Sequence, residues 1–175
     1  VVLDGDDRVV DAEWIPQLTL SITLRLDGFG LLMGLIVSGI GTLVMLYSTQ
    51  YFGRRDDLGR LAGLLTAFAG AMLGIVWADG LLTLFVFWEL TSITSFLLIG
   101  FSHEKASARR AAVQALLVTG LGGLVLLAGL IMLGLEAGGF ELSALKSADL
   151  VSSPIYVPIV VCVLVGCFSK SAILP

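Results

Sequence analysis

Five runs of apolar residues with almost no charge constrain this chain more than any other feature. They extend over about 28–52, 61–77, 81–101, 111–135 and 155–175. About 20 apolar residues in a helix cross the roughly 30 Å hydrocarbon layer of a bilayer. A helix also satisfies its own backbone hydrogen bonds, which lipid cannot do. The sequence therefore predicts an all-α, polytopic membrane helix bundle with about five transmembrane helices.

The composition supports this class and excludes others. The chain is 57% hydrophobic and 14% charged, whereas soluble domains are about 45–50% apolar and about 25% charged. Its net charge of −4 argues against a nucleic-acid partner, which would require clustered Lys and Arg. Cys162 and Cys167 stand five apart in an apolar run without a nearby His or acidic residue, so we interpret them as packing residues. We expect no metal and no cofactor.

The connectors between the apolar runs differ in charge. Connectors 53–60 and 102–110 hold six of the ten Lys and Arg residues, whereas segments 1–27, 78–80 and 136–154 together hold three. Short loops rich in Lys and Arg stay in the cytoplasm. We therefore predict a multi-pass protein of the cell membrane, with connectors 53–60 and 102–110 in the cytoplasm and an extracytoplasmic N-terminal segment, 1–27, ahead of the bundle at 28–175.

Two smaller features complete the organisation. Asp11 to Leu26 is the longest stretch that is not apolar, and we expect a short strand or a loop at the surface there. Several glycines inside the runs are four residues apart, a spacing that lets helix backbones approach closely. We interpret this spacing as packing inside one bundle; the pairs are Gly30/Gly34, Gly59/Gly63 and Gly70/Gly74.

Glu89 is the most informative single position. It stands nine residues after Gly80, about 13 Å along a helix and so near the middle of the bilayer. An ionised carboxylate there is costly unless it is paired, and such residues usually serve function. The alternative is a protonated Glu that only holds helices together. Hydroxyl groups that could hydrogen-bond the carboxylate or a chain of water follow in the same run, at Thr91, Ser92, Thr94 and Ser95.

Lys170 is the second ionisable residue within an apolar run. In a helix that begins near Ile155 it lies about 22 Å along, past the middle of the bilayer. One interpretation is that its side chain reaches out to the cytoplasmic headgroups. The other is a broken transport helix that lines a hydrated cavity. The residues around Lys170 favour the second interpretation; they are Gly166, Ser169, Ser171 and Pro175.

Asp79 is a weaker candidate. It precedes Gly80 at the expected start of a helix, where a helix N-cap is the common role of an aspartate. A role at the outer mouth of an ion path is the alternative. The single histidine, His103, lies in a charged connector, and we interpret it as a solvated loop residue.

Several motifs together carry a family resemblance. Arg25–Gly28, Phe87–Ser92, Ser95–Phe101 and Ser169–Ala172 resemble the antiporter-like subunits shared by Mrp-type multisubunit Na+/H+ antiporters and respiratory complex I. Within that superfamily, Phe87–Ser92 and Ala115–Gly123 are most similar to the large A subunit of the Mrp antiporters.

The resemblance implies a site and a larger protein. It makes Glu89 and Lys170 the key protonatable pair, and it places the chain within a larger bundle built from two inverted repeats. The chain would then be a fragment of a longer subunit.

Three functions are compatible with these features. The leading hypothesis is a non-enzymatic subunit of a monovalent cation/proton antiporter. It would exchange Na+ for H+ in pH and sodium homeostasis, and its partners would be other membrane subunits and the lipid bilayer. The alternative is a proton-translocating membrane subunit of an NADH:quinone oxidoreductase or a related hydrogenase complex, without a redox site of its own. The third is a structural bundle in which Glu89 and Lys170 only brace helices.

Overall fold

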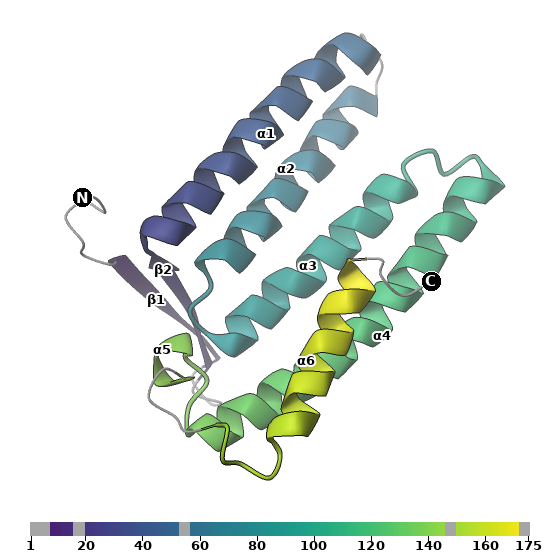
Figure 1. Ribbon diagram of the computed structural model, residues 1–175. Coiled ribbons are helices and arrows are strands. Elements are labelled where there is room, and N and C mark those ends of the chain that lie inside the picture. Colours follow the sequence, from purple (N-terminus) through teal and green to yellow (C-terminus); the bar gives the residue numbers. More distant parts are fainter. Residues whose placement is uncertain (1–7, 16–19, 53–56, 146–149, 172–175) are drawn as a thin grey trace.

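The computed structural model describes residues 8–15, 20–52, 57–145 and 150–171 (Figure 1). Five helices of 15 residues or more lie among them, together with a strand pair and one short helical turn. In chain order the elements are β1 (Arg8–Ile15), β2 (Leu20–Leu26), α1 (Gly28–Phe52), α2 (Asp57–Trp77), α3 (Leu81–Ile99), α4 (Ala106–Ala137), α5 (Leu142–Leu145) and α6 (Tyr156–Lys170).

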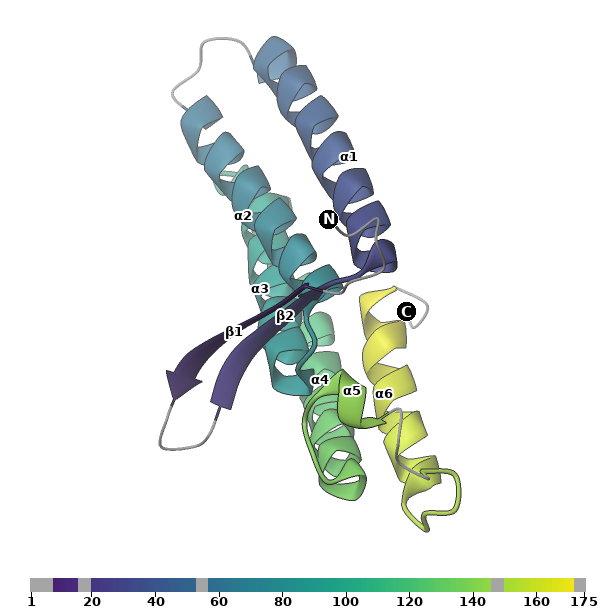
Figure 2. The ribbon, with the colours of Figure 1, turned by 90° about the vertical axis from the view of Figure 1, so that its left-hand side faces the viewer.

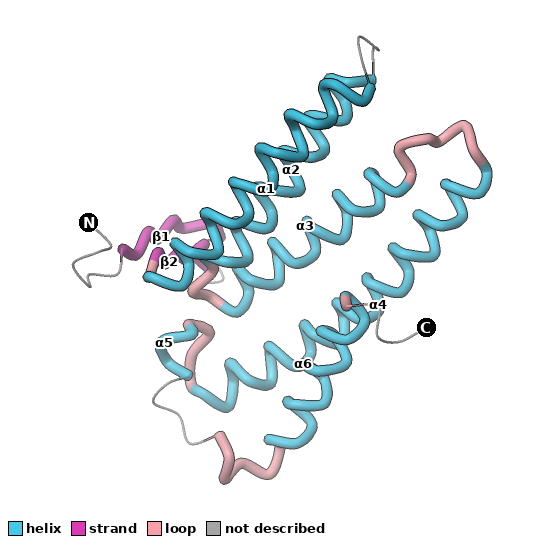
Figure 3. The backbone as a smooth tube through the Cα atoms, turned by 45° about the horizontal axis from the view of Figure 1, so that its top comes forward, coloured by secondary structure: helices cyan, strands magenta, loops and turns pink. Residues whose placement is uncertain are grey.

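The helices form the predicted bundle. Helices α1 to α4 stand in a row, each packed against the next, and α6 lies against α4 (Figures 1 and 3). Within the described residues, α1 to α4 are long and apolar enough to cross a membrane, and α6 is a shorter apolar helix of 15 residues. Large apolar side chains are exposed along these helices, among them Leu35 and Leu43 on α1. The multi-pass membrane architecture is thus confirmed.

The fifth predicted span, 155–175, differs from the observed helix in length. Helix α6 ends at Lys170, so it extends for about 22 Å and is too short to cross the hydrocarbon layer by itself. This end agrees with the predicted break near Lys170. Residues 172–175 lie outside the described residues.

The segment before α1 adds a strand pair that the all-α prediction does not include. Strands β1 and β2 pair antiparallel, from Arg8 opposite Leu26 to Ile15 opposite Leu20, with a register shift between Glu13 and Ile15. Both strands contain several β-branched residues, which favour a pleated conformation. Of the two forms expected over 11–26, a short strand or a loop, the structure therefore has strands, and they pair as a hairpin. The hairpin projects away from the helices at one end of the bundle (Figure 2).

Three connectors meet at the hairpin end of the bundle. The backbone N–H of Asp79 donates to the Thr23 carbonyl at 2.9 Å, and the N–H of Leu142 donates to the Asp79 carbonyl at 2.7 Å. The Arg25 guanidinium also pairs with the Asp79 carboxylate at 2.8 Å. These contacts join the hairpin, the turn 78–80 and the start of α5.

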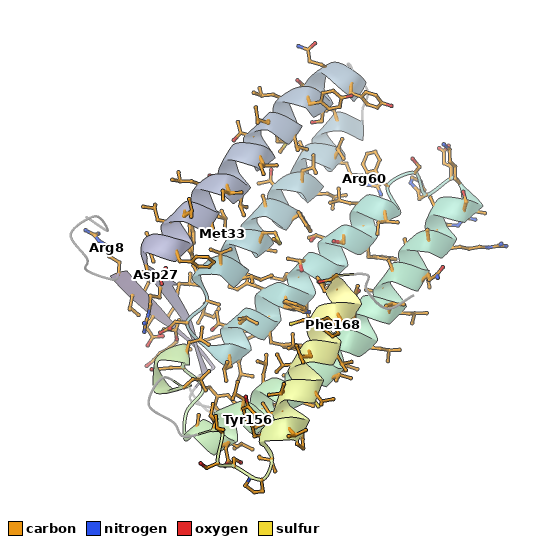
Figure 4. The ribbon with its side chains drawn as sticks, in the orientation of Figure 1. Arg8, Asp27, Met33, Arg60, Tyr156 and Phe168 are labelled. Carbon is orange, nitrogen blue, oxygen red and sulfur yellow. The ribbon has the colours of Figure 1, made fainter. Side chains whose placement is uncertain are left out.

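The basic connectors lie at the opposite end. Arg60 is far from Asp27, and its guanidinium lies 5.1 Å from the centre of the Phe101 ring (Figure 4). Arg109 at the start of α4 donates to the His103 carbonyl at 2.6 Å. The structure therefore separates the two sets of connectors as the charge pattern predicts.

Glycines allow close packing at some of the expected positions. A Cβ atom at Gly34 would lie 3.1 Å from the Trp77 ring, and one at Gly74 would overlap the Phe87 ring. A Cβ at Gly59, Gly63 or Gly70 would meet no atom of the described residues within 4 Å. The glycine spacing thus marks helix contacts only where an aromatic side chain from another element faces it.

Candidate functional site

The candidate site lies where α3, α4 and α6 meet. A small core of Leu81, Leu126 and Leu130 fixes α3 against α4, and Trp88 packs against that core. The last turn of α6 stands beside the middle of α3, because the first turn of α6 lies beyond the first residues of α3 (Figure 1). This placement brings Lys170 to the part of α3 that carries Glu89.

Lys170 makes three contacts with α3. Its Nζ donates to Ser92 Oγ at 2.6 Å and to the Trp88 carbonyl oxygen at 3.1 Å. It also lies 5.2 Å from the centre of the Trp88 ring, within the range of a cation–π interaction. Trp88 and Ser92 are the eighth and twelfth of the 19 residues of α3. The side chain therefore points into the bundle at the level of the middle of α3, which disagrees with a side chain that reaches out to the headgroups.

Glu89 points toward α4. Its carboxylate packs directly against the backbone of Gly123. Oε1 is buried and has no hydrogen-bond partner within the described part of the chain. A buried carboxylate oxygen without a partner is unusual, because most buried polar atoms are hydrogen-bonded.

The neighbouring hydroxyls form no hydrogen bond with this carboxylate among the described residues, and their contact with a chain of water stays a prediction. Thr91 Oγ1 donates to the Trp88 carbonyl and Thr94 Oγ1 to the Leu90 carbonyl, each at 2.7 Å. Serine and threonine hydroxyls in a helix can donate to the carbonyl three or four residues earlier, and Thr91 and Thr94 do so here. Ser92 instead contacts Lys170, while Ser95 is half-buried one turn farther along α3.

Glu89 and Lys170 are neighbours without being in direct contact. Both lie in the described part of the chain, where they form no ion pair. One turn of α3 connects the two residues. Lys170 Nζ donates to Ser92, which is three residues after Glu89, and to the carbonyl of Trp88, which immediately precedes Glu89.

The serines beside Lys170 have different surroundings. Ser169 is buried against Gly122 of α4, and its Oγ donates to the Gly166 carbonyl at 2.7 Å. Ser171 is exposed, and its backbone N–H ends the helix by donating to the Cys167 carbonyl at 3.1 Å. Both therefore serve the end of α6 rather than the Glu89 carboxylate. Cys162 and Cys167 are free and half-buried in α6, as their interpretation as packing residues predicts.

Asp79 lies at the hairpin end of the bundle, and its predicted role as a helix N-cap is wrong. Gly80 is the N-cap of α3 and makes no side-chain capping bond. The Asp79 side chain turns instead to Arg25, whose positive charge is a stronger partner than a backbone N–H. Asp79 precedes Glu89 by ten residues of chain, about 15 Å along the helix. The structure does not bring it into the Glu89–Lys170 site.

Known protein families match the part of the chain that contains this site. The model of the NADH:quinone oxidoreductase/Mrp antiporter transmembrane family matches residues 78–175. The chain belongs to the NADH:quinone oxidoreductase/Mrp antiporter transmembrane family. A second model, for the N-terminus of chain 5 of NADH-ubiquinone oxidoreductase (complex I), matches residues 14–60. The residues that the first model matches include both Glu89 and Lys170.

Individual relatives of this antiporter-family chain are much longer than it is. It is 47% identical over 165 residues to a probable K(+)/H(+) antiporter A/B subunit of Rhizobium meliloti, covering 93% of this chain and 16% of the relative. It is 38% identical over 175 residues to the A1 subunit of a Na(+)/H(+) antiporter of Staphylococcus aureus, covering 99% of this chain and 22% of the relative.

A solved structure shares the fold. A chain in the structure of the Mrp complex from Dietzia sp. superposes with a TM-score of 0.87 at 37% identity, covering 94% of this chain and 18% of that one. The resemblance to the Mrp A subunits is therefore confirmed, and the antiporter-family chain spans about a fifth of the length of its relatives.

Two features of the site in this antiporter-family chain do not follow from the sequence. The sequence places Trp88 beside Glu89 but does not show that it receives Lys170. Likewise, Gly122 and Gly123 mark a resemblance, but their contacts with Ser169 and Glu89 depend on how α4 faces its two neighbours. A pair of adjacent glycines inside a long apolar run is the one indication that a sequence offers of such contacts.

Proposed function

We propose that this chain is part of the A subunit of a multisubunit monovalent cation/proton antiporter, and that Glu89 and Lys170 are its proton relay. The protein exchanges Na+ or another monovalent cation for H+ and so serves pH and sodium homeostasis. The names of the two relatives and of the solved complex support antiport. The same names favour it over the redox-driven alternative, a proton-translocating subunit of an NADH:quinone oxidoreductase, which would use the same pair.

The observation that carries the proposal is the contact of Lys170 with Ser92, one turn from Glu89. A proton that arrives at Glu89 cancels a negative charge near the Lys170 ammonium and so changes the free energy of that positive charge. By linkage, a proton that leaves Lys170 changes the free energy of the charge on Glu89 by the same amount. Ionisable residues inside a membrane bundle commonly form such relays.

The surroundings of the relay follow from the charge pattern. Segment 1–27 lies outside the cell and precedes the bundle at 28–175, while connectors 53–60 and 102–110 face the cytoplasm. The partners of the protein are other membrane subunits of the antiporter, the lipid bilayer, Na+ and H+. The chain carries out no redox or hydrolytic chemistry and requires no cofactor or nucleic acid.

The test replaces Glu89 by Gln in the full-length subunit within its complex. Glu89→Gln preserves the shape of the side chain but cannot exchange a proton, so a role in packing survives the change and a relay does not. We expect exchange of Na+ for H+ in everted membrane vesicles to be lost, with normal amounts of assembled complex. The matched control is Thr94→Ala, a buried polar residue on the same helix whose hydroxyl bonds only its own helix. Exchange at the wild-type rate by assembled Glu89→Gln complex would refute the proposal.

A further inference from the structure

Two adjacent glycines of α4 face the two halves of the relay. A Cβ atom added at Gly123 would overlap Oε1 of Glu89 and lie 3.0 Å from its Cδ. A Cβ added at Gly122 would overlap Ser169, the residue before Lys170. Both glycines are buried, and they lie on neighbouring sides of the helix, one toward α3 and the other toward α6.

The contact at Gly123 is with the end of a flexible side chain. Glu89 is the only residue that a Cβ at Gly123 would meet among its three nearest atoms, and all three belong to the carboxylate. An added methyl group can therefore be accommodated when the carboxylate moves, without displacement of α3 or α4. Gly123 therefore has more effect on where the Glu89 carboxylate lies than on how α3 and α4 pack.

The contact at Gly122 is with the body of α6. A Cβ atom added at Gly166 of α6 would lie 3.1 Å from two backbone atoms of α4, the Gly122 carbonyl oxygen and Leu126 Cα. The backbones of α4 and α6 therefore approach closely at the turn that ends in Lys170. This approach holds the end of α6 against the bundle, where the Lys170 side chain reaches Trp88 and Ser92.

We propose that Gly122 and Gly123 are positioning residues of the relay: Gly123 leaves the space in which the Glu89 carboxylate lies, and Gly122 seats the end of α6 that presents Lys170. Together they set the separation between the two charges. The inference rests on the proposed function, because it assigns the pair a role in coupling two groups that exchange protons.

Gly123→Ala tests the inference against a matched control on the same helix. Gly120→Ala makes the same chemical change one turn earlier in α4, where an added Cβ would meet no atom within 4 Å in the part of the chain that the structure describes. Both variants are made in the full-length protein and assayed in the assembled complex, as antiport rate in everted vesicles over a range of pH. We expect Gly123→Ala to reduce the rate roughly tenfold to a hundredfold, as small misplacements of reacting groups do, and to alter the shape of the pH profile. Gly120→Ala should leave both unchanged.

A rescue experiment separates positioning from general damage. Glu89→Asp shortens the side chain by one CH2 group, which leaves room for the methyl group of Gly123→Ala. The double variant should therefore exchange ions at the rate of Glu89→Asp alone, because the two changes use the same space and are not additive. If the complex with Gly123→Ala alone fails to assemble, the rate of the double variant is still compared with that of Glu89→Asp, and this comparison tests the positioning role.

These experiments distinguish a failure of the positioning role from a failure of the proposed function. Wild-type exchange in Gly123→Ala, while Glu89→Gln is inactive, would overturn the positioning role and leave the relay intact. So would a double variant much slower than Glu89→Asp, or equal losses in Gly120→Ala and Gly123→Ala. Wild-type exchange in Glu89→Gln would instead overturn the relay itself.

Discussion

Ser92→Ala removes the shortest contact of Lys170 and leaves the rest of the site in place. Ser92 Oγ accepts a hydrogen bond from Lys170 Nζ at 2.6 Å, and only 2% of Ser92 is exposed. Hydrogen bonds to charged groups contribute about 1.5–3 kcal/mol. Since about 1.4 kcal/mol is a factor of ten, the loss corresponds to a decrease of roughly tenfold to a hundredfold in the population of the docked ammonium.

The remaining contacts set where in this range the effect falls. The Trp88 carbonyl at 3.1 Å and the Trp88 ring at 5.2 Å still hold the ammonium after the change. We therefore expect the lower end of the tenfold to hundredfold range, which is a decrease of about tenfold in the antiport rate of Ser92→Ala. Alanine also favours the helix, so assembly should be unaffected.

The assay is exchange of Na+ for H+ in everted vesicles, normalised to the amount of assembled complex. Thr94→Ala is the control, because the Thr94 hydroxyl donates to the carbonyls of Leu90 and Thr91 and contacts neither relay residue. If Ser92→Ala and Thr94→Ala had equal rates, Ser92 would not position Lys170, and the link through α3 would be refuted.

Two further predictions concern stability, measured as thermal denaturation of the purified complex in detergent. Asp79→Ala removes the 2.8 Å pair between Arg25 and Asp79 and should destabilise the hairpin end by about 1.5–3 kcal/mol, the range for a hydrogen bond to a charged group. Asp79→Ala with Arg25→Met should recover part of the loss. An unchanged melting temperature for Asp79→Ala would contradict this prediction. Gly74→Ala should lower the melting temperature because its methyl group would overlap the Phe87 ring. Gly70→Ala, whose methyl group would meet no described atom within 4 Å, should leave the melting temperature unchanged or raise it. Equal effects of the two changes would show that Gly74 does not serve the packing of α2 on α3.

Much of the fold follows from local sequence, and the exceptions have physical causes. Helix α1 occupies 28–52 as predicted, because Asp27 caps its start: Asp27 Oδ1 accepts from the Gly30 N–H at 2.6 Å. Helices α2 and α4 begin earlier than the apolar runs, at Asp57 and Ala106, because a helix can continue into the polar interface beyond the hydrocarbon. Apolar runs predict which residues lie in the hydrocarbon layer, but they do not predict where a helix begins.

The site was only partly predictable. Glu89 and Lys170 stand out in the sequence because ionisable residues are rare in apolar runs. Their separation does not follow from the sequence, because it depends on α6 ending beside the middle of α3. The hydroxyls can be named from the sequence, but spacing alone does not show that those of Thr91 and Thr94 donate to carbonyls of their own helix.

The central claim is that the charge on Lys170 and the charge on Glu89 depend on one another, and infrared difference spectroscopy tests it most directly. In the full-length antiporter complex, the C=O band of the protonated Glu89 carboxyl is assigned by its absence in Glu89→Gln and is followed as pH is changed. If the two charges are coupled, Lys170→Met moves the pH at which this band appears, and Thr94→Ala does not. A band that titrates at the same pH in Lys170→Met and in the wild type would contradict the coupling of the two residues.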